Sequence, residues 1–184
     1  MRVREFLSVV SSTGSVVAIT ATFKKDSNNG GSNGSIDLSS GDKGILNYAY
    51  ALEQLEAAFY IQVITTQYSG ATSDEISLLT DIRDHEIAHR EFFKAALSTS
   101  AIPGLEVNFT AIDFSSRDSV LGTAKAFEDL GVSAYNGAGQ LRTNPDYLVV
   151  AGKIVSVEER HAAYIRDVLS SGSFADMTAV HANG

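Results

Sequence analysis

Two short motifs in this chain of 184 residues place a histidine three positions after a glutamate. The first runs from Glu86 to His89 (EIAH) and the second from Glu158 to His161 (EERH). On an α-helix this spacing puts both side chains on one face, about one turn apart, so both can ligate one metal ion. One such motif often arises by chance, but two in one chain indicate a metal site.

Two further glutamates, Glu53 and Glu128, lie on stripes of apolar residues with helical spacing. Each is followed seven residues later by a tyrosine, which is Tyr60 in the first case and Tyr135 in the second. The chain therefore repeats one pattern in two halves: a glutamate, a tyrosine and then a Glu-x-x-His motif. Carboxylates and imidazoles that project inward from four helices in this way form the ligand set of di-iron and di-manganese carboxylate proteins.

Electrostatics favours metal ions at such a site. Four ionised glutamates buried together would strongly destabilise the fold, and two divalent cations would cancel their charge. Oxygen and imidazole ligands suit Fe and Mn, and the absence of cysteine excludes thiolate sites. The sequence therefore predicts two divalent metal ions, Fe or Mn. The predicted ligands are Glu53, Glu86, His89, Glu128, Glu158 and His161.

Three neighbours of these ligands have open roles. Glu56, three residues after Glu53, is an alternative ligand, a supporting group or a carboxylate that shifts on oxidation. The spacing from Glu53 to Tyr60, which the second half repeats, favours Glu53 as the ligand. Tyr60 and Tyr135 either donate hydrogen bonds to the ligating carboxylates or belong to the plain core.

Other titratable residues are expected to face solvent. His85 belongs to no motif, and His181 lies in a polar tail. Glu159 and Asp129 neighbour the ligands but point away from the inner face. A competing interpretation pairs the motif glutamates at the surface with Arg83, Arg90, Arg142 or Arg160. Leu, Ile and Phe surround the glutamates on their stripes, which favours burial and a metal site.

Helical periodicity predicts four helices, at about 43–67, 73–98, 116–141 and 145–171. Asp42 is expected to cap the first helix, Ser73 to begin the second and Pro145 to begin the fourth. Residues 99–115 have no helical period and are long enough to cross the bundle. No stretch alternates convincingly with period two. The predicted fold class is therefore all-α, a four-helix bundle with a long crossover between helices 2 and 3.

Composition excludes several classes of function. Fourteen Lys and Arg residues against 22 Asp and Glu give a net charge of −8, which argues against nucleic-acid binding. Without cysteine, zinc fingers, iron–sulfur clusters and disulfides are excluded. The length suits one compact domain, which we place at residues 42–172, followed by a tail at 173–184.

Residues 1–23 predict an export leader or an N-terminal hydrophobic segment. Arg2 and Arg4 give a short basic start, and an uncharged run with small residues near its end follows up to Phe23. Ser, Thr and Gly interrupt this run, so it is marginal as a membrane-spanning helix, although residues 1–23 could associate with a membrane. Residues 24–41 (KKDSNNGGSNGSIDLSSG) predict a flexible polar linker.

Several segments of the predicted bundle resemble one known family. They are residues 45–49 (ILNYA), 52–60 (LEQLEAAFY), 128–138 (EDLGVSAYNGA) and 157–163 (VEERHAA). These segments are similar to the ferritin-like domain family that includes the plant desiccation-related proteins, and the resemblance covers about residues 42–170. It implies a ferritin-like bundle in which all six metal positions of the wider superfamily are intact. Exported bacterial members with a leader and a tether resemble residues 1–41, which implies the periplasm or cell envelope of a bacterium.

Three hypotheses for the function follow. In the favoured one, the chain is a di-metal carboxylate protein that oxidises Fe²⁺ or reacts with O₂ or peroxide in stress protection, with Glu53 and Glu128 as catalytic ligands. In the second, the metals brace the bundle without turnover. In the third, the chain is a structural or assembly-forming protein of the cell envelope. The expected partners are metal ions, O₂ or peroxide and further copies of the chain, and whether it is an enzyme stays open.

Overall fold

The computed structural model describes residues 8–10, 16–18, 20–23, 41–139 and 145–175. Nearly all of the predicted linker at 24–41 and most of the predicted tail at 173–184 lie outside these residues. The same holds for Arg142 and His181, so the expectations about them are not addressed by the structure.

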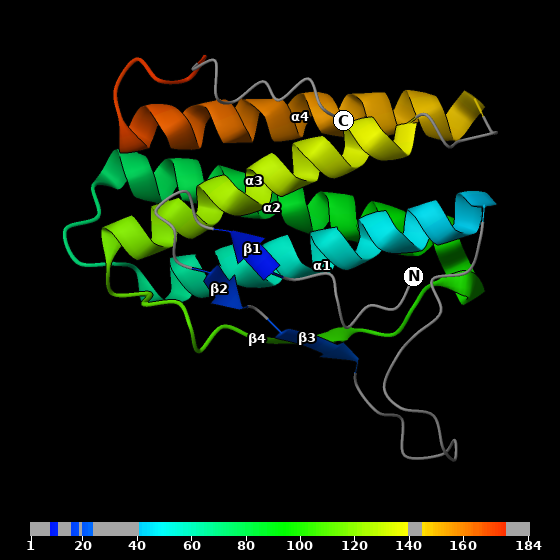
Figure 1. Cartoon of the computed structure of the whole chain (residues 1–184), viewed down its shortest axis with the longest axis horizontal. Helices are drawn as coiled ribbons and strands as arrows, with labels where there is room; N and C mark the ends of the chain where they lie inside the picture. Colours follow the sequence, from blue (N-terminus) through cyan, green and yellow to red (C-terminus); the bar gives the residue numbers. More distant parts are fainter. Residues whose placement is uncertain (1–7, 11–15, 19, 24–40, 140–144, 176–184) are drawn as a thin grey trace.

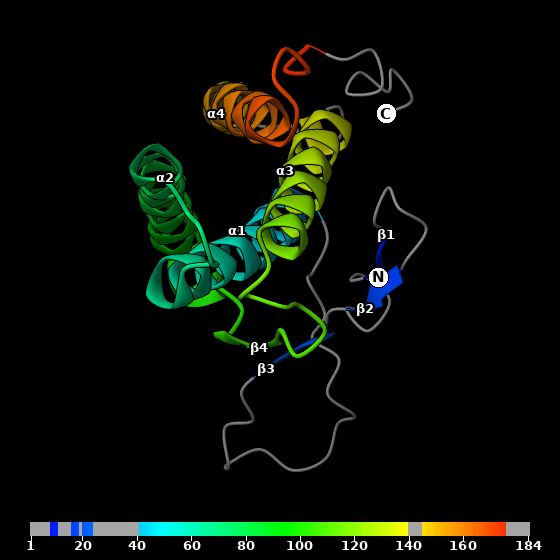
Figure 2. The same ribbon diagram turned by 90° about the vertical axis from the view of Figure 1, so that its left-hand side faces the viewer.

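Four long helices form the bundle shown in Figure 1. They are α1 (Gly41–Thr66), α2 (Ser73–Leu97), α3 (Arg117–Gly139) and α4 (Pro145–Leu169). Helix α1 packs against α2, and α3 packs against α4. Figure 2 looks along these two helical hairpins. The predicted fold class, an all-α four-helix bundle, is confirmed.

The starts of the helices differ in detail from the prediction. Asp42, expected to cap α1, lies inside its first turn because the helix already begins at Gly41. Helix α2 is capped by Thr72, and not by Ser73: the Thr72 hydroxyl accepts from the Glu75 backbone N–H at 3.2 Å. The Glu75 carboxylate accepts in return from the Thr72 N–H at 3.0 Å, which completes a capping box.

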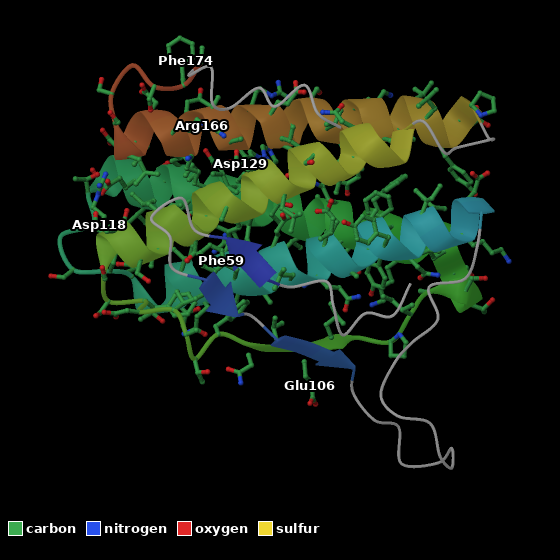
Figure 3. All side chains as sticks on the ribbon, in the orientation of Figure 1. Phe59, Glu106, Asp118, Asp129, Arg166 and Phe174 are labelled. Carbon is green, nitrogen blue, oxygen red and sulfur yellow. The ribbon has the colours of Figure 1, made fainter. Side chains whose placement is uncertain are left out.

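Two apolar clusters fill the interior of the bundle. The first is centred on Phe59 and Phe127, whose rings meet edge to face with centroids 5.0 Å apart; Figure 3 labels Phe59. The second contains Phe93 and Tyr135, with ring centroids 6.2 Å apart. On every helix the predicted ligands lie between residues of the first cluster and residues of the second. The apolar clusters therefore close both ends of the polar layer between them.

The segment between α2 and α3 is anchored along α1. It contains a short 3₁₀ turn (Ser98–Ser100) and the strand β4 (Leu105–Asn108). The amide of Asn47 donates to the carbonyl of Ser100 at 3.0 Å and accepts from the N–H of Ile102 at 2.9 Å. Gln54 accepts from the N–H of Leu105 at 2.8 Å. As predicted, this long connection crosses the bundle, so that α1 and α3 run in opposite directions in Figure 1.

Four short strands add two small antiparallel pairs, which the sequence did not predict. β1 (Ser8–Val10) pairs with β2 (Val16–Ala18), and β3 (Thr20–Phe23) pairs with β4. Thr20 lies opposite Asn108 and Phe23 opposite Leu105. Part of the segment at 1–23 therefore lies against the crossover. None of the helices within the described residues is long and apolar enough to cross a membrane.

Candidate metal centre

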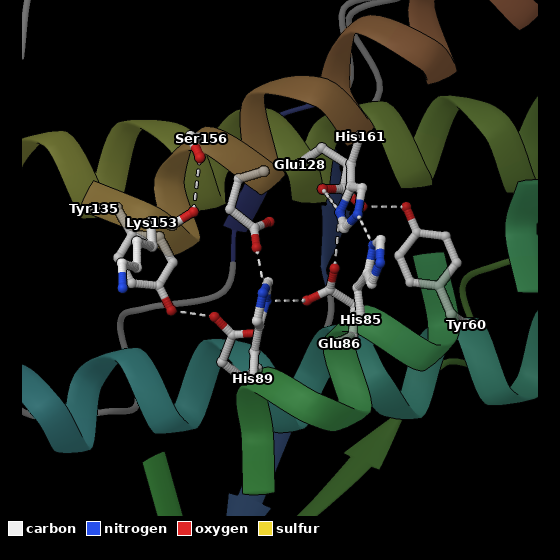
Figure 4. Close-up of polar contacts among 11 residues, drawn as sticks. Tyr60, His85, Glu86, His89, Glu128, Tyr135, Lys153, Ser156 and His161 are labelled. Carbon is white, nitrogen blue, oxygen red and sulfur yellow. Dashed lines mark hydrogen bonds and ion pairs between the residues drawn. The ribbon is translucent and has the colours of Figure 1, made fainter. Parts of the chain in front are cut away.

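The structure brings all six predicted ligand residues together at the centre of the bundle, and Figure 4 shows part of this cluster. Their donor atoms form two overlapping groups, within each of which the atoms lie no more than 4.8 Å apart. The group that we name the His89 position consists of Glu53, Glu86, His89 and Glu158. The group that we name the His161 position consists of Glu86, Glu128, Glu158 and His161. Glu86 and Glu158 belong to both, as bridging carboxylates would.

Both histidines turn Nδ1 toward the carboxylates. His89 Nδ1 lies 3.0 Å from Glu158 Oε1 and 3.4 Å from Glu53 Oε2. His161 Nδ1 lies 2.9 Å from Glu86 Oε1 and 3.4 Å from Glu128 Oε2. Each histidine therefore lies nearest to the glutamate of the other Glu-x-x-His motif, which links α2 to α4.

The donor atoms are buried and lack hydrogen bonds. Each of the four glutamates is 0% exposed. At least one carboxylate oxygen of each of them, and Nδ1 of both histidines, has no hydrogen-bond partner. Buried polar atoms without partners are costly and rare in folded proteins. Oxygen and imidazole donors that converge without partners fit a pair of divalent cations.

Burial and mutual repulsion shape the protonation of the carboxylates. Burial raises the pKa of Glu53 to about 8, and it also raises the pKa of Glu128 and, strongly, that of Glu158. Burial opposes ionisation of Glu86 as well, but the two histidines beside it lower its pKa to about 2. The cluster is thus a place where a positive charge is strongly favoured.

The histidines respond in the opposite direction. Burial alone would lower their pKa values, but the surrounding carboxylates raise the pKa of His89 to about 12 and that of His161 to about 10. Protons on the imidazoles partly neutralise the four carboxylates. Metal ions at the same place would supply the compensating charge instead.

The two tyrosines reach across the bundle to the opposite half. Tyr60 of α1 donates to Glu128 Oε1, and Tyr135 of α3 donates to Glu53 Oε1. The crossed pairs form because α1 and α3 are antiparallel and both have the same spacing of seven residues. Burial raises the pKa of both phenols well above 10, which keeps them protonated as donors. Of the two roles left open by the sequence, the tyrosines therefore have the role of hydrogen-bond donors to these carboxylates.

Glu56 lies beside the cluster but belongs to neither group of donor atoms. It is 1% exposed, and its Oε2 has no hydrogen-bond partner. Burial and the charge of Glu158 raise its pKa well above the ordinary value. Gly131 of α3 makes room for it, because a Cβ at this glycine would lie 3.4 Å from Glu56 Oε1 and 3.3 Å from Glu158 Oε2. This geometry favours Glu53 over Glu56 as the ligand from α1.

Sequence reasoning missed two contributors to the cluster, His85 and Gly131. His85 is exposed, as expected, but its Nδ1 also lies 2.9 Å from Nε2 of His161. Its position four residues before His89, which places both on one helical face, could have indicated this role. Gly131 stands three residues after Glu128, where the first half has Glu56 after Glu53. Aligning the two halves could have identified it.

The competing interpretation, in which arginines neutralise the motif glutamates, is wrong for the described residues. Arg83 pairs with the neighbouring Asp84 and Arg90 with Glu91, both at the surface. No arginine in the described part of the chain forms an ion pair with the four central glutamates.

A buried arginine has a different partner in the second half. Arg166, which is 6% exposed, pairs with Asp129 and also donates to the carbonyl of Ala162 at 3.2 Å. Figure 3 labels Arg166 on α4 and Asp129 on α3. Asp129 was expected to be solvated; its side chain is 37% exposed, and it also links these two helices through Arg166. Glu159 is exposed, as expected.

Comparison with known families matches residues 41–171 to the ferritin-like domain. This range covers most of the chain, all four helices and every residue of the two donor groups. Searches of curated proteins and of solved structures found no match.

Proposed function

This chain belongs to the ferritin-like domain family, and we propose that it is a di-metal carboxylate protein that oxidises Fe²⁺ or reacts with O₂ or peroxide. The observation that carries the proposal is the set of buried, converging donor atoms without hydrogen bonds. Glu86 and Glu158 would bridge the two positions. His89 with Glu53 and His161 with Glu128 would complete them.

The tyrosines prepare the terminal carboxylates for this task. Tyr135 occupies Oε1 of Glu53, and Tyr60 occupies Oε1 of Glu128. The remaining oxygen of each glutamate, Oε2, is the one that faces a histidine Nδ1. Each tyrosine thus fixes which oxygen is free to act as a ligand, in the manner of the outer hydrogen bonds that orient metal ligands elsewhere.

When bound, Fe or Mn ions supply one-electron redox chemistry toward O₂ or peroxide. In a ferroxidase reaction, two Fe²⁺ substrates each give one electron to O₂, which takes up two protons and leaves as H₂O₂. The chain would hold both substrates close together through its shared glutamates. The apolar clusters around Phe59 and Phe93 would limit the entry of water from the two ends of the bundle. We further propose that this chemistry serves stress protection, in a protein exported to the cell envelope.

The test is the metal content of the purified protein after anaerobic loading with Fe²⁺ or Mn²⁺. We expect about two ions per chain in the wild type and less than a tenth of an ion in the Glu86→Ala/Glu158→Ala double variant, because both shared carboxylates are gone. The matched control replaces two exposed glutamates, Glu91 and Glu159, with alanine and should retain both ions.

Activity is then measured as O₂ consumption and H₂O₂ formation on addition of Fe²⁺. Oxidation in the wild type that is lost in the Glu86→Ala/Glu158→Ala variant supports the proposed reaction. Two bound ions without any turnover would reduce the function to a metal-braced bundle. Less than a tenth of an ion in the wild type would overturn the proposal, and the structural or assembly role would then lead.

A further inference from the structure

The two proposed metal positions differ in the hydrogen bonding of their histidines at Nε2, the ring nitrogen that points away from the carboxylates. Nε2 of His161, which points away from the carboxylates, lies 2.9 Å from Nδ1 of His85. For Nε2 of His89, no hydrogen bond exists within the described part of the chain. The two halves differ in sequence at the same point, because His85 precedes Glu86 whereas Val157 precedes Glu158.

The rings of His85 and His161 meet in good hydrogen-bond geometry. Their planes are within 12° of parallel, and their centroids are 5.1 Å apart. The distance between the centroids is about the sum of three lengths: the 2.9 Å between the two nitrogens and, for each ring, the distance from its centroid to its nitrogen. Both nitrogens therefore lie near the line between the ring centres. The rings are therefore nearly coplanar and meet edge to edge. A proton on one nitrogen points directly at the lone pair of the other.

This contact determines which nitrogen of His161 is free to bind a metal ion. A neutral imidazole carries one N–H and one lone pair, and a metal ligand must offer the lone pair. With His85 Nδ1 as acceptor, the proton of His161 resides on Nε2, and the lone pair resides on Nδ1. Nδ1 is the atom that faces Glu86 and Glu128. In this direction of the hydrogen bond, His85 holds the ring in the orientation and the tautomer that metal binding needs.

We propose that His85 is a positioning residue that makes the His161 position the tighter of the two metal positions. The inference rests on the proposed function, because it assumes that the central cluster binds metal ions. His89 lacks an equivalent partner for its Nε2 among the described residues, so no such hydrogen bond fixes the tautomer of its ring. His85 belongs to neither group of donor atoms, and its Nδ1 is engaged with His161, so it would act on the site through His161.

The probe is Mn²⁺, titrated anaerobically into metal-free protein and followed by calorimetry and by the electron paramagnetic resonance signal of free Mn²⁺. We expect two affinities in the wild type. His85→Phe keeps a planar ring but removes the acceptor, and it should weaken the tighter of the two affinities by about 10- to 100-fold. His85→Asn places a carbonyl oxygen where Nδ1 stands and should restore most of the loss. Val157→Ala, at the equivalent place in the second half, should leave both affinities within about twofold.

Two backgrounds assign the effect to one position. In His89→Ala protein, which retains the His161 position, His85→Phe should weaken the remaining ion by the same factor. In His161→Ala protein, it should change nothing, because the contact is already absent. Thermal melting of the metal-free variants identifies any that fail to fold.

The outcomes separate the two proposals. Wild-type protein without bound Mn²⁺ would count against the metal centre itself. Wild-type protein with two bound ions that His85→Phe leaves unchanged would overturn the role of His85 alone. A loss that His85→Asn fails to restore would also overturn it, because an acceptor at this place would then not be what the tighter position needs.

Discussion

The two halves of the bundle, α1 with α2 and α3 with α4, carry the same chemical pattern in the same order. Each supplies a glutamate, a tyrosine seven residues later and a Glu-x-x-His motif. The structure places the equivalent residues around one centre, and each tyrosine serves the glutamate of the other half. Neither half alone therefore supplies all the donor atoms of either group, and both groups form only when the halves pack.

The halves differ at two points that touch the site. Three residues after the first glutamate, the first half has Glu56 and the second has Gly131, and these two face each other. One residue before the Glu-x-x-His motif, the first half has His85 and the second has Val157. The repeat supplies the donor atoms, whereas its departures give the two proposed metal positions different surroundings.

The largest expected effect comes from breaking the crossed hydrogen bonds one at a time. Tyr60→Phe and Tyr135→Phe each leave a buried carboxylate oxygen without its donor. We expect each to lower the free energy of unfolding of metal-free protein by about 1–3 kcal/mol, the cost of leaving a buried polar group without its hydrogen bond. Chemical denaturation in the presence of a chelator measures both values. Near-equal losses are expected, because the two contacts are equivalent.

Tyr164→Phe is the control for these variants, since Tyr164 is 57% exposed. It should change the free energy of unfolding by less than about 0.5 kcal/mol. If Tyr60→Phe were as harmless as this control while Tyr135→Phe was costly, the equivalence of the two halves would not extend to their tyrosines.

A smaller effect should follow from filling the space opposite Glu56. A helix-interior glycine changed to alanine gains about 1 kcal/mol of stability. In Gly131→Ala, contacts of 3.3–3.4 Å with two carboxylates offset this gain, so we expect a net change below about 1 kcal/mol. Affinity for Mn²⁺ should fall by roughly tenfold, about 1.4 kcal/mol, because the displaced Glu158 belongs to both positions.

Gly137→Ala on the same helix is the matched control. A Cβ at Gly137 meets nothing within 4 Å, so this variant should gain the stability and keep its affinity for Mn²⁺. Equal Mn²⁺ affinities for the two alanine variants would show that the space at Gly131 does not matter for binding.

Local patterns in the sequence predicted much of the fold. The helix at 43–67 was found at 41–66, and the helix at 73–98 was found at 73–97. Apolar periodicity and the breaks at glycine and proline are local features, so they reveal helices reliably. The pairing of β3 with β4 joins residues far apart in the chain, and no local pattern reports such a contact.

The site shows the same division between local and distant information. The Glu-x-x-His spacing located the ligand faces of α2 and α4 because both residues of a motif lie on one helical turn. Which tyrosine meets which glutamate depends on the antiparallel arrangement of α1 and α3, which spacing alone does not specify. The contact of His85 with His161 joins α2 to α4 and was missed for the same reason.

The smallest expected effect concerns how the second helix of each half begins. Helix α4 starts with Pro145, whereas α2 starts with a capping box in which Glu75 also accepts from Arg117 Nε at 2.8 Å. Burial alone would raise the pKa of Glu75, but the hydrogen bonds from Thr72 and Arg117 lower it. The folded chain therefore binds this proton less well than the unfolded chain does.

It follows that Glu75 stabilises the fold at a pH above its unfolded pKa of about 4.3, and that this stabilisation is lost as the pH falls through the lower folded pKa. Glu75→Gln keeps a capping-box side chain and removes the charge. Because Arg117 is 36% exposed, we expect this variant to lose only about 0.5 kcal/mol at pH 7. The difference from wild type, measured by denaturation at a series of pH values, should shrink as the pH falls below about 4.3 and vanish once the pH is below the lower folded pKa of Glu75. A difference that persisted there would mean that the shape of the carboxylate, and not its charge, stabilises the start of α2.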